Sequence, residues 1–425
     1  MTEGTVGSQG AVGSEGTVGP AGPEGATSTR NPGTGEPPAG TLDAETGERP
    51  PGTRNPVALS DRLPTPLLFP LLAYGAAWGL IFAAWQVANA IYHVPWSWAK
   101  YFLYGNASSY NWLAVHGYAG PHEVPPTPAQ AAYFPVLPLL AKTVSNMTRH
   151  QYLPAEMIIQ AVAGAMAAMA VWALAAKIGG HRLGDRTVLL FCAFPGAMSF
   201  GMFYPQPLGI ALAACCLLAA LNRKWLLAGL LALVASAVHP VFMVLTPTLA
   251  VVAAQAIIAR RDWQSLTAPL LAPLGMVGYF GLLGGEFHDY LFWFHYQERG
   301  WSGRLSWIAH EWHVLTWTDP ATSKYVLFNV IVIAMAVVLI GGIALMIYAR
   351  TPLPVSLYTV LVVLALGMAD TTGPTPRFAW AALGIFTGLS AKLPRFLFWP
   401  LVVICAGLLV FLYGWWPHQG ATSAP

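Results

Sequence analysis

Residues 156–176 read EMIIQAVAGAMAAMAVWALAA, a run of about 20 residues with one charged side chain. A helix of this length crosses a hydrocarbon core roughly 30 Å thick, and the run does not alternate as a barrel strand would. Comparable runs recur from residue 66 onward, so the sequence predicts an all-α polytopic membrane protein with about 11 transmembrane helices. The predicted spans are 67–91, 156–176, 187–203, 207–221, 225–238, 241–258, 266–284, 325–349, 353–369, 378–391 and 396–415.

The composition excludes a soluble protein. Of the 425 residues, 56% are apolar and 9% are charged, and the mean hydropathy is +0.53. The net charge of +3 is too small to indicate a nucleic-acid partner. The four cysteines all lie inside apolar spans, which is typical of small buried hydrophobic side chains and not of a disulfide framework or a metal site. They are Cys192, Cys215, Cys216 and Cys405. No cofactor is predicted.

Glycine recurs at every third position between Gly4 and Gly25, within a segment that precedes the first apolar run. A collagen triple helix needs this period but also abundant proline, and the repeat contains only two prolines. The segment also lacks the basic start and apolar core of a signal peptide. We therefore expect residues 1–65 to be a disordered cytoplasmic repeat tail, followed by a membrane domain over 66–415 and an external tail over 416–425.

Lys and Arg orient the predicted spans, because cytoplasmic loops collect these residues. An N-terminus inside the cell places fourteen of the 21 basic residues in the tail or in short cytoplasmic loops. This arrangement requires residues 131–147, which contain two prolines, to be an interfacial segment that does not cross. The sequence thus predicts a cytoplasmic N-terminus and an external C-terminus. The loop residues that decide this are Lys177, Arg182, Arg186, Arg223, Lys224, Arg260, Arg261, Arg350, Lys392 and Arg395.

Polar residues gather in several segments that this topology places outside. The first is a large loop over residues 92–155, and the second is the turn 203–207 with the later turn 236–240. The third combines residues 285–324 with 370–377. Because these segments meet the ends of spans on one side, they predict a site that opens towards the outer leaflet.

These segments, in this order, resemble the PIG-V-like mannosyltransferases, a branch of the GT-C superfamily of polyprenyl-phosphate-sugar-dependent enzymes. The likeness covers about residues 66–415, and it implies a GT-C-like bundle that transfers mannose. The matching loop residues are Tyr110, His116, Gly117, Tyr118, Phe134, Pro135 and Pro138. The later residues to which the resemblance assigns donor binding are Tyr204, His239, Gln297, Trp301 and Arg377, and of these His239 stands where the family has an Arg.

The resemblance also identifies positions where this chain departs from the family pattern. Asn106 stands where the family has its catalytic Asp, and Gln206 stands where it has a Glu. An amide keeps the shape of a carboxylate but cannot accept a proton from a hydroxyl at neutral pH. We expect Glu123 or Asp370 to be the best substitute acids. They belong to a set of external carboxylates that comprises Glu123, Glu156, Glu286, Asp289, Glu298, Glu311, Asp319 and Asp370.

Plainer interpretations stand beside these assignments. Arg377 could place its charge at the membrane interface or pair with Asp370 instead of binding the lipid phosphate of a donor. His239 could cap a helix or fill the core. The aromatic side chains of the first loop could belong to a membrane-interface belt and not stack on a sugar.

The sequence therefore favours a transferase that moves mannose from polyprenyl-phosphate-mannose to a lipid or glycan acceptor at the outer face. The alternative is a catalytically inactive homologue that binds a sugar-lipid or serves as a partner subunit of an active enzyme. Both hypotheses expect a polyprenyl-phosphate-sugar and membrane lipid as partners, and neither expects nucleic acid.

Overall fold

The computed structural model describes residues 65–93, 95–118, 133–295, 326–367 and 375–415. These residues form helices and no strands, and they belong to one compact unit that extends from Ala58 to Pro425. The first loop contributes α2 (Trp98–Phe102), α3 (Ala107–His116), α5 (Val136–Ser145) and η2 (Asn146–Thr148), after the long α1 (Thr65–Tyr92). The chain then runs through α6 (Tyr152–Gly179), α7 (His181–Ala193), η3 (Pro195–Gly201), α8 (Gln206–Leu221) and α9 (Trp225–Ser236).

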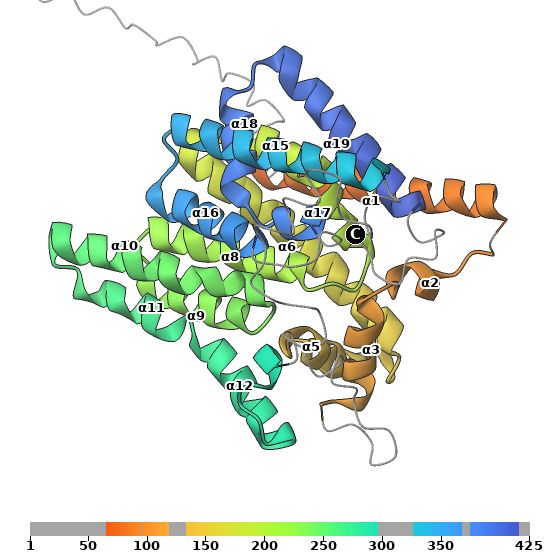
Figure 1. The fold of residues 1–425 in the computed structure, drawn as a ribbon, viewed down its shortest axis with the longest axis horizontal. Helices are drawn as coiled ribbons and strands as arrows, with labels where there is room; N and C mark the ends of the chain where they lie inside the picture. Colours follow the sequence, from red (N-terminus) through yellow and green to blue (C-terminus); the bar gives the residue numbers. More distant parts are fainter. Residues whose placement is uncertain (1–64, 94, 119–132, 296–325, 368–374, 416–425) are drawn as a thin grey trace, which may run out of the picture. The chain divides into compact units, whose positions relative to one another are not determined.

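The second half continues in the same way. It contains η4 (Pro240–Val244), α10 (Leu245–Arg260), η5 (Trp263–Leu266), α11 (Thr267–Leu271) and α12 (Leu274–Phe287). After the gap come α15 (Val326–Tyr348), α16 (Leu353–Gly367), α17 (Thr375–Ala379), α18 (Leu383–Lys392) and α19 (Arg395–Trp415). Figure 1 shows these elements in order along the chain.

Five of the described helical segments are long and apolar enough to cross a membrane. They are Leu67–Tyr92, Tyr152–Gly179, Pro240–Arg260, Trp263–Phe287 and Arg395–Gly414. A sixth is possible if η3 and α8, which meet at 113°, form one broken span. The number, length and composition of these segments indicate an integral membrane protein, as the sequence predicts.

The finer topology is not settled by these lengths. α9 and α16 contribute only short apolar helices, Trp225–Ser236 and Leu353–Leu366, and α15 is 23 residues long, with its side chains described over Ala334–Tyr348. The predicted span 187–203 is divided between α7 and η3, because the helix stops at Ala193 and restarts at Pro195. The count of eleven spans therefore stays a prediction. α5 has 10 residues and rises only about 15 Å, so it is too short to cross, as expected for 131–147.

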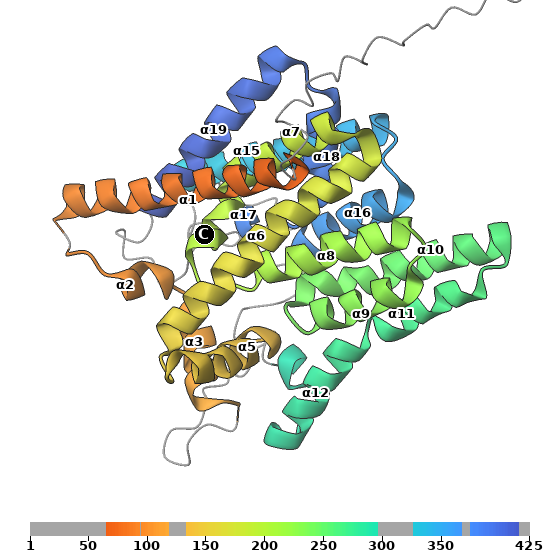
Figure 2. The ribbon, with the colours of Figure 1, turned by 180° about the vertical axis from the view of Figure 1, so that it is seen from behind.

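The interior is organised around α6, which packs against α8, α7 and α1 (Figures 1 and 2). Small side chains at Ala163, Gly164 and Ala167 let its neighbours approach closely, as is usual between membrane helices. A Cβ atom at Gly164 would overlap the rings of Tyr74 and Phe200. α6 therefore holds α1 and η3 at positions that a larger side chain would not permit.

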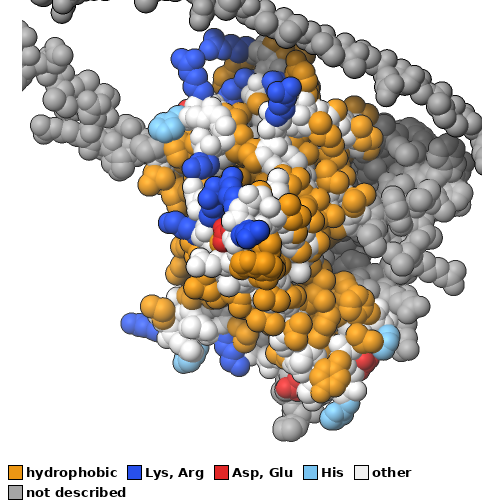
Figure 3. All heavy atoms as spheres, turned by 90° about the vertical axis from the view of Figure 1, so that its left-hand side faces the viewer, with side chains coloured by type: hydrophobic (Ala, Val, Ile, Leu, Met, Phe, Trp, Pro, Cys, Tyr) orange, Lys and Arg blue, Asp and Glu red, His pale blue; other side chains and the backbone are white. Residues whose placement is uncertain are grey.

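Basic side chains gather at the connections between helices, and Figure 3 shows one face on which Lys and Arg lie beside a broad apolar surface. Contacts join several of these connections: Trp225 Nε1 donates to Asp262 Oδ2 at 2.8 Å, and the Lys392 ammonium lies 4.6 Å from the centre of the Tyr348 ring. The exposed basic residues at these connections are Lys177, Arg182, Arg223, Lys224, Arg260, Arg261, Arg350, Lys392 and Arg395.

Candidate functional site

The candidate site is centred on the break between η3 and α8. Pro205 and Pro207 flank Gln206, and a proline in the middle of a helix would lose a backbone hydrogen bond, so α8 starts afresh at Gln206. The backbone amide of Phe203 donates to the carbonyl of Phe102 at 3.0 Å, which fixes the break against α2. The break thereby presents Tyr204 to the start of α3.

α3 begins beside Tyr204 because Gly105 adopts a left-handed conformation, with φ at 61°, and turns the chain out of α2. The Tyr204 hydroxyl donates to the Tyr104 carbonyl at 3.2 Å and lies within reach of the backbone amides of Asn106 and Ala107. Asn106 is half-buried at the cap position of α3, and its side chain makes no capping hydrogen bond. The structure therefore places Asn106 next to Tyr204 by way of its backbone.

Arg377 lies over the ring of the same tyrosine. It belongs to the short helix α17, which packs against η3, and only 3% of its surface is exposed. Its guanidinium carbon is 4.4 Å from the centre of the Tyr204 ring and 5.3 Å from that of Phe378. Its Nε has no hydrogen-bond partner among the described residues, whose one ion pair joins Asp289 to His295. The described part of the chain thus leaves a buried cation without a counter-charge.

His239 completes this group from the turn between α9 and η4. The residue before a proline favours an extended backbone, and His239 has φ at −165° as it caps η4. Its Nδ1 accepts from the Val241 amide at 3.3 Å, and its ring centre is 5.2 Å from that of Phe378. Burial, together with the charge of Arg377, lowers the pKa of His239 from 6.5 to about 3. The ring is therefore neutral at physiological pH, with its proton on Nε2.

Tyr110 lies one turn into α3 and faces the same group. Its side chain is buried, with the ring 4.8 Å from that of Tyr133 and 6.5 Å from that of Phe203. Burial raises the pKa of Tyr110 well above 10, whereas the nearby charge of Arg377 opposes this shift. The phenol is therefore neutral and close enough to Arg377 to feel its charge.

The remaining residues of the loop motif pack the loop onto other helices. Tyr118 and Phe134 join Tyr279 of α12 in a small core, where the Phe134 and Tyr279 ring centres are 4.4 Å apart. The Tyr118 hydroxyl donates to the Tyr133 carbonyl. Pro135 and Pro138 are buried at the start of α5, where the Val136 amide donates to the Ala237 carbonyl at 3.3 Å. This bond connects α5 to the turn that carries His239.

His116 and Gly117 lie at the other end of α3. The His116 ring is exposed, stacks on Trp112 at 4.5 Å and has Nδ1 3.0 Å from the Trp112 carbonyl oxygen. Gly117 ends the helix with φ at 78°. Among the described residues, neither makes a hydrogen bond or ring contact with Arg377 or Tyr204, so the structure places them at the end of α3 and not in the site.

A polar face on α6 was missed by the resemblance. Glu156 is fully buried, and Asn111 Nδ2 of α3 donates to its Oε1 at 2.8 Å. Gln160, one turn further on, donates to the Ser199 carbonyl of η3. The side-chain oxygens Glu156 Oε2, Gln160 Oε1, Ser199 Oγ and Gln206 Oε1 are buried without partners among the described residues. The sequence does contain a pattern that indicates this polar face, because a Glu and a Gln lie four residues apart inside an apolar run.

Four predicted site residues lie outside the described ranges. They are the substitute acids Glu123 and Asp370 and the donor-binding residues Gln297 and Trp301. The site that the structure does bring together therefore consists of Asn106, Tyr110, Tyr204, His239 and Arg377, with Gln206 two residues from Tyr204.

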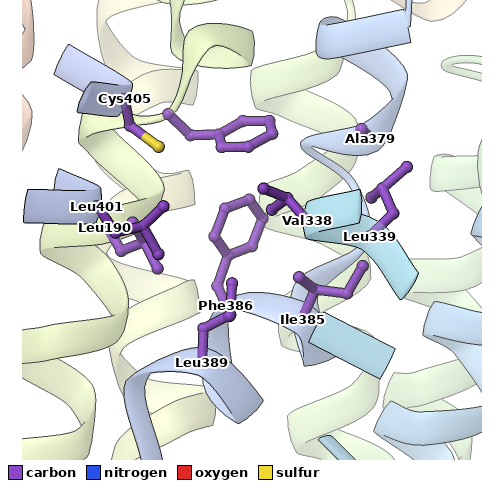
Figure 4. A pocket seen from close by; sticks show the side chains of 10 residues that line it. Leu190, Val338, Leu339, Ala379, Ile385, Phe386, Leu389, Leu401 and Cys405 are labelled. Atoms are coloured by element: carbon purple, nitrogen blue, oxygen red, sulfur yellow. The ribbon is translucent and has the colours of Figure 1, made fainter. Parts of the chain in front are cut away.

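Two further features bear on what the site can hold. The described residues contain no group of His, Cys, Asp and Glu that could ligate a metal ion. A separate cavity of about 10 Å³ lies between α7, α15, α18 and α19 and is lined by apolar side chains and Cys405 (Figure 4). This is at the lower limit for one water molecule, so the cavity is a packing defect and not a ligand site.

Comparison with known proteins adds no assignment. No family model matches this sequence, and no curated protein matches it significantly. The resemblance to PIG-V-like mannosyltransferases therefore rests on the motif residues alone.

Proposed function

We propose that this chain is a GT-C-like membrane glycosyltransferase that moves mannose from polyprenyl-phosphate-mannose to a lipid or glycan acceptor at the outer membrane face. The observation that carries this proposal is Arg377. It is buried beside two aromatic rings, and its Nε has no partner among the described residues. A buried cation without a counter-charge is costly, and an anionic ligand would remove that cost.

A phosphate group is the anion that best fits this position. The planar guanidinium presents several N–H donors to phosphate oxygens, and its hydrogen bonds to an ionised group are strong. His239 is neutral with Nδ1 used as an acceptor, so its Nε2–H is available to donate to a phosphate or sugar oxygen. Tyr204 holds the guanidinium against the break between η3 and α8.

In the proposed reaction an acceptor hydroxyl attacks the anomeric carbon of the mannose. The bond from this carbon to the phosphate oxygen breaks, and the lipid phosphate leaves with the bonding electrons. Arg377 and His239 would stabilise the negative charge that develops on the leaving group. The proton of the acceptor hydroxyl needs a base, and the amide of Asn106 cannot supply one.

The proposal includes the full topology predicted from the sequence. Eleven spans would place the N-terminus in the cytoplasm, the C-terminus outside and residues 92–155 in an external loop that covers the site. Exposed basic residues at five connections between helices support this orientation.

A second candidate is a catalytically inactive homologue that binds the lipid-linked sugar or assists an active partner subunit. Two observations favour it: an amide stands at position 106, and another amide, Gln206, is buried two residues after Tyr204. Neither side chain can act as a general base at neutral pH.

One assay separates the two candidates. Purified protein is incubated with labelled polyprenyl-phosphate-mannose and a membrane lipid extract, and both donor binding and transfer are measured. The enzyme proposal expects binding and transfer by the wild type. If the chain is an inactive homologue, we expect the wild type to bind the donor without transfer and the Asn106→Asp variant to transfer mannose. If neither the wild type nor the Asn106→Asp variant binds the donor, both candidate functions are contradicted.

A further inference from the structure

Glu156 is unusual because it places a carboxyl group in the interior. Among the described residues, only Glu156 and Arg377 are charged side chains that are buried. Burying a carboxylate is costly unless its oxygens are hydrogen-bonded. The fifth position of α6 has no need of an acid for packing, since its neighbours on the buried face are Ala155, Ile159 and Ala163. This Glu therefore requires an explanation other than stability.

The hydrogen bonds of Glu156 connect it to the candidate site. Its Oε1 accepts from Asn111, which follows Tyr110 in α3, and α3 is the helix that begins after Asn106. Tyr110 is close enough to Arg377 for the guanidinium charge to act on its hydroxyl. The carboxylate is thus attached to the same short helix that borders Arg377 and Tyr204.

The other oxygen of Glu156 indicates what kind of ligand it would take. Its Oε2 has no partner among the described residues, and the same is true of Gln160 Oε1 and Ser199 Oγ. Glu156 and Gln160 are four residues apart and so lie on one face of α6. Gln160 in turn contacts Ser199. Acceptor oxygens without donors favour a ligand rich in hydroxyl groups.

We propose that Glu156 binds the attacking hydroxyl of the acceptor through Oε2 and serves as the base that Asn106 cannot be. This inference rests on the proposed transferase function. As the acceptor oxygen forms its bond to the anomeric carbon, the hydroxyl proton passes to Glu156 Oε2. The bond to the phosphate oxygen breaks, and its electron pair leaves with the lipid phosphate. Asn111 is a positioning residue, because its amide fixes Oε1 and aims Oε2.

The test compares the wild type with Glu156→Gln, which keeps the shape and removes the basicity. We expect transfer to fall at least about 100-fold while donor affinity stays within about twofold, because a general base acts on the acceptor and not on the donor. Thermal stability is expected to stay equal or to rise, since an uncharged amide is cheaper to bury. If Glu156 had only a structural role, Glu156→Gln would lower thermal stability and leave transfer by the folded protein unchanged.

The matched control is Asp262→Asn, the same change of acid to amide at a half-buried carboxylate held by Trp225. We expect it to retain wild-type transfer. Glu156→Asp, which keeps a carboxylate on a shorter side chain, provides a second variant and is expected to retain more transfer than Glu156→Gln.

The outcomes distinguish this inference from the proposed function. An active wild type with an equally active Glu156→Gln variant would overturn the role of Glu156 alone. Loss of donor affinity in Glu156→Gln equal to the loss of transfer would assign the bound hydroxyl to the donor sugar and overturn the proposal. A wild type that binds the donor without transfer would refute the transferase function, and the base with it.

Discussion

Two arginines in this molecule lie over aromatic rings at similar distances, yet their surroundings differ. The Arg377 guanidinium is 4.4 Å from the Tyr204 ring centre, and the Arg186 guanidinium is 4.2 Å from that of Phe398. Arg186 is half-buried, and its Nη2 donates to the Leu393 carbonyl at 2.7 Å. Arg377 is buried, and its Nε has no partner among the described residues.

Under the proposed function, this difference separates a structural arginine from one that binds the phosphate of a ligand. Arg186 connects α7 to the turn between α18 and α19, so its hydrogen bond and ring contact stabilise the fold. Among the described residues, Arg377 contacts aromatic rings and its Nε–H has no acceptor, which costs stability in the absence of an anion. The pair therefore provides an internal control for every test of the site.

The largest expected effect comes from Arg377→Met compared with Arg186→Met. Loss of the buried, charged guanidinium should weaken binding of polyprenyl-phosphate-mannose by about 2–5 kcal/mol, roughly 30-fold or more. The same change should raise the stability of the ligand-free protein by about 1–4 kcal/mol, since it removes a buried charge that has no ion-pair partner among the described residues. Arg186→Met should leave donor binding unchanged and lower stability by about 1 kcal/mol.

Titration calorimetry with polyprenyl-phosphate-mannose and thermal unfolding measure these two quantities. If Arg377→Met destabilises the protein as Arg186→Met does, Arg377 has a structural partner and the contrast between the two arginines disappears.

A smaller effect is expected from Gly196, which packs against the segment that carries Arg377, compared with Gly407, which has open space around it. A Cβ atom at Gly196 of η3 would overlap the Pro376 carbonyl and Trp380, on either side of Arg377, whereas one at Gly407 of α19 meets nothing within 4 Å. Gly196→Ala should lower stability by about 1–3 kcal/mol and weaken donor binding, because α17 must move. Gly407→Ala should raise stability by up to about 1 kcal/mol.

Thermal unfolding and donor binding of the two variants check this prediction. Equal stability changes at both positions would show that the contact between η3 and α17 does not fix Arg377.

The smallest effect concerns His239 and pH. Its pKa is lowered from 6.5 to about 3, so below pH 6.5 the unfolded state takes up a proton that the folded state does not. Stability present at neutral pH is then lost as pH falls, by about 0.7 kcal/mol between about pH 7 and pH 6. His239→Gln should remove this part of the slope. Arg377→Met should raise the pKa of His239, whereas Arg186→Met should not.

Unfolding curves at several pH values measure the slope, and an NMR titration of His239 measures its pKa. A pKa that is the same with and without Arg377 would show that the two side chains do not interact.

Much of the architecture follows from the sequence. Apolar runs of about 20 residues predict membrane helices, and the described residues contain helices only, with five or six long enough to cross. The division of 187–203 was missed, although Pro195 follows Ala193 closely and indicates a helix end. Apolar content alone does not show where a helix stops, because both sides of such a break are equally apolar.

The candidate site was predictable in part. Tyr204, His239 and Arg377 are far apart in the sequence, and the structure brings them together, but their role in donor binding stays a prediction. The sequence places Glu156 among the external carboxylates but favours Glu123 and Asp370 as substitute acids, because these two lie nearer to matched positions. Only the fold shows that Asn111 of α3 contacts Glu156 of α6 across 45 residues.

The measurement that tests the central claim most directly compares two ligands on the wild-type protein and on Arg377→Met. The ligands are polyprenyl phosphate and the corresponding polyprenol, which differ only in the phosphate. We expect the wild type to bind the phosphate more tightly than the alcohol by at least about 30-fold, and Arg377→Met to lose this preference. Equal binding of the two lipids by the wild type, or an unchanged preference in the variant, would contradict the assignment of Arg377 as the phosphate-binding residue.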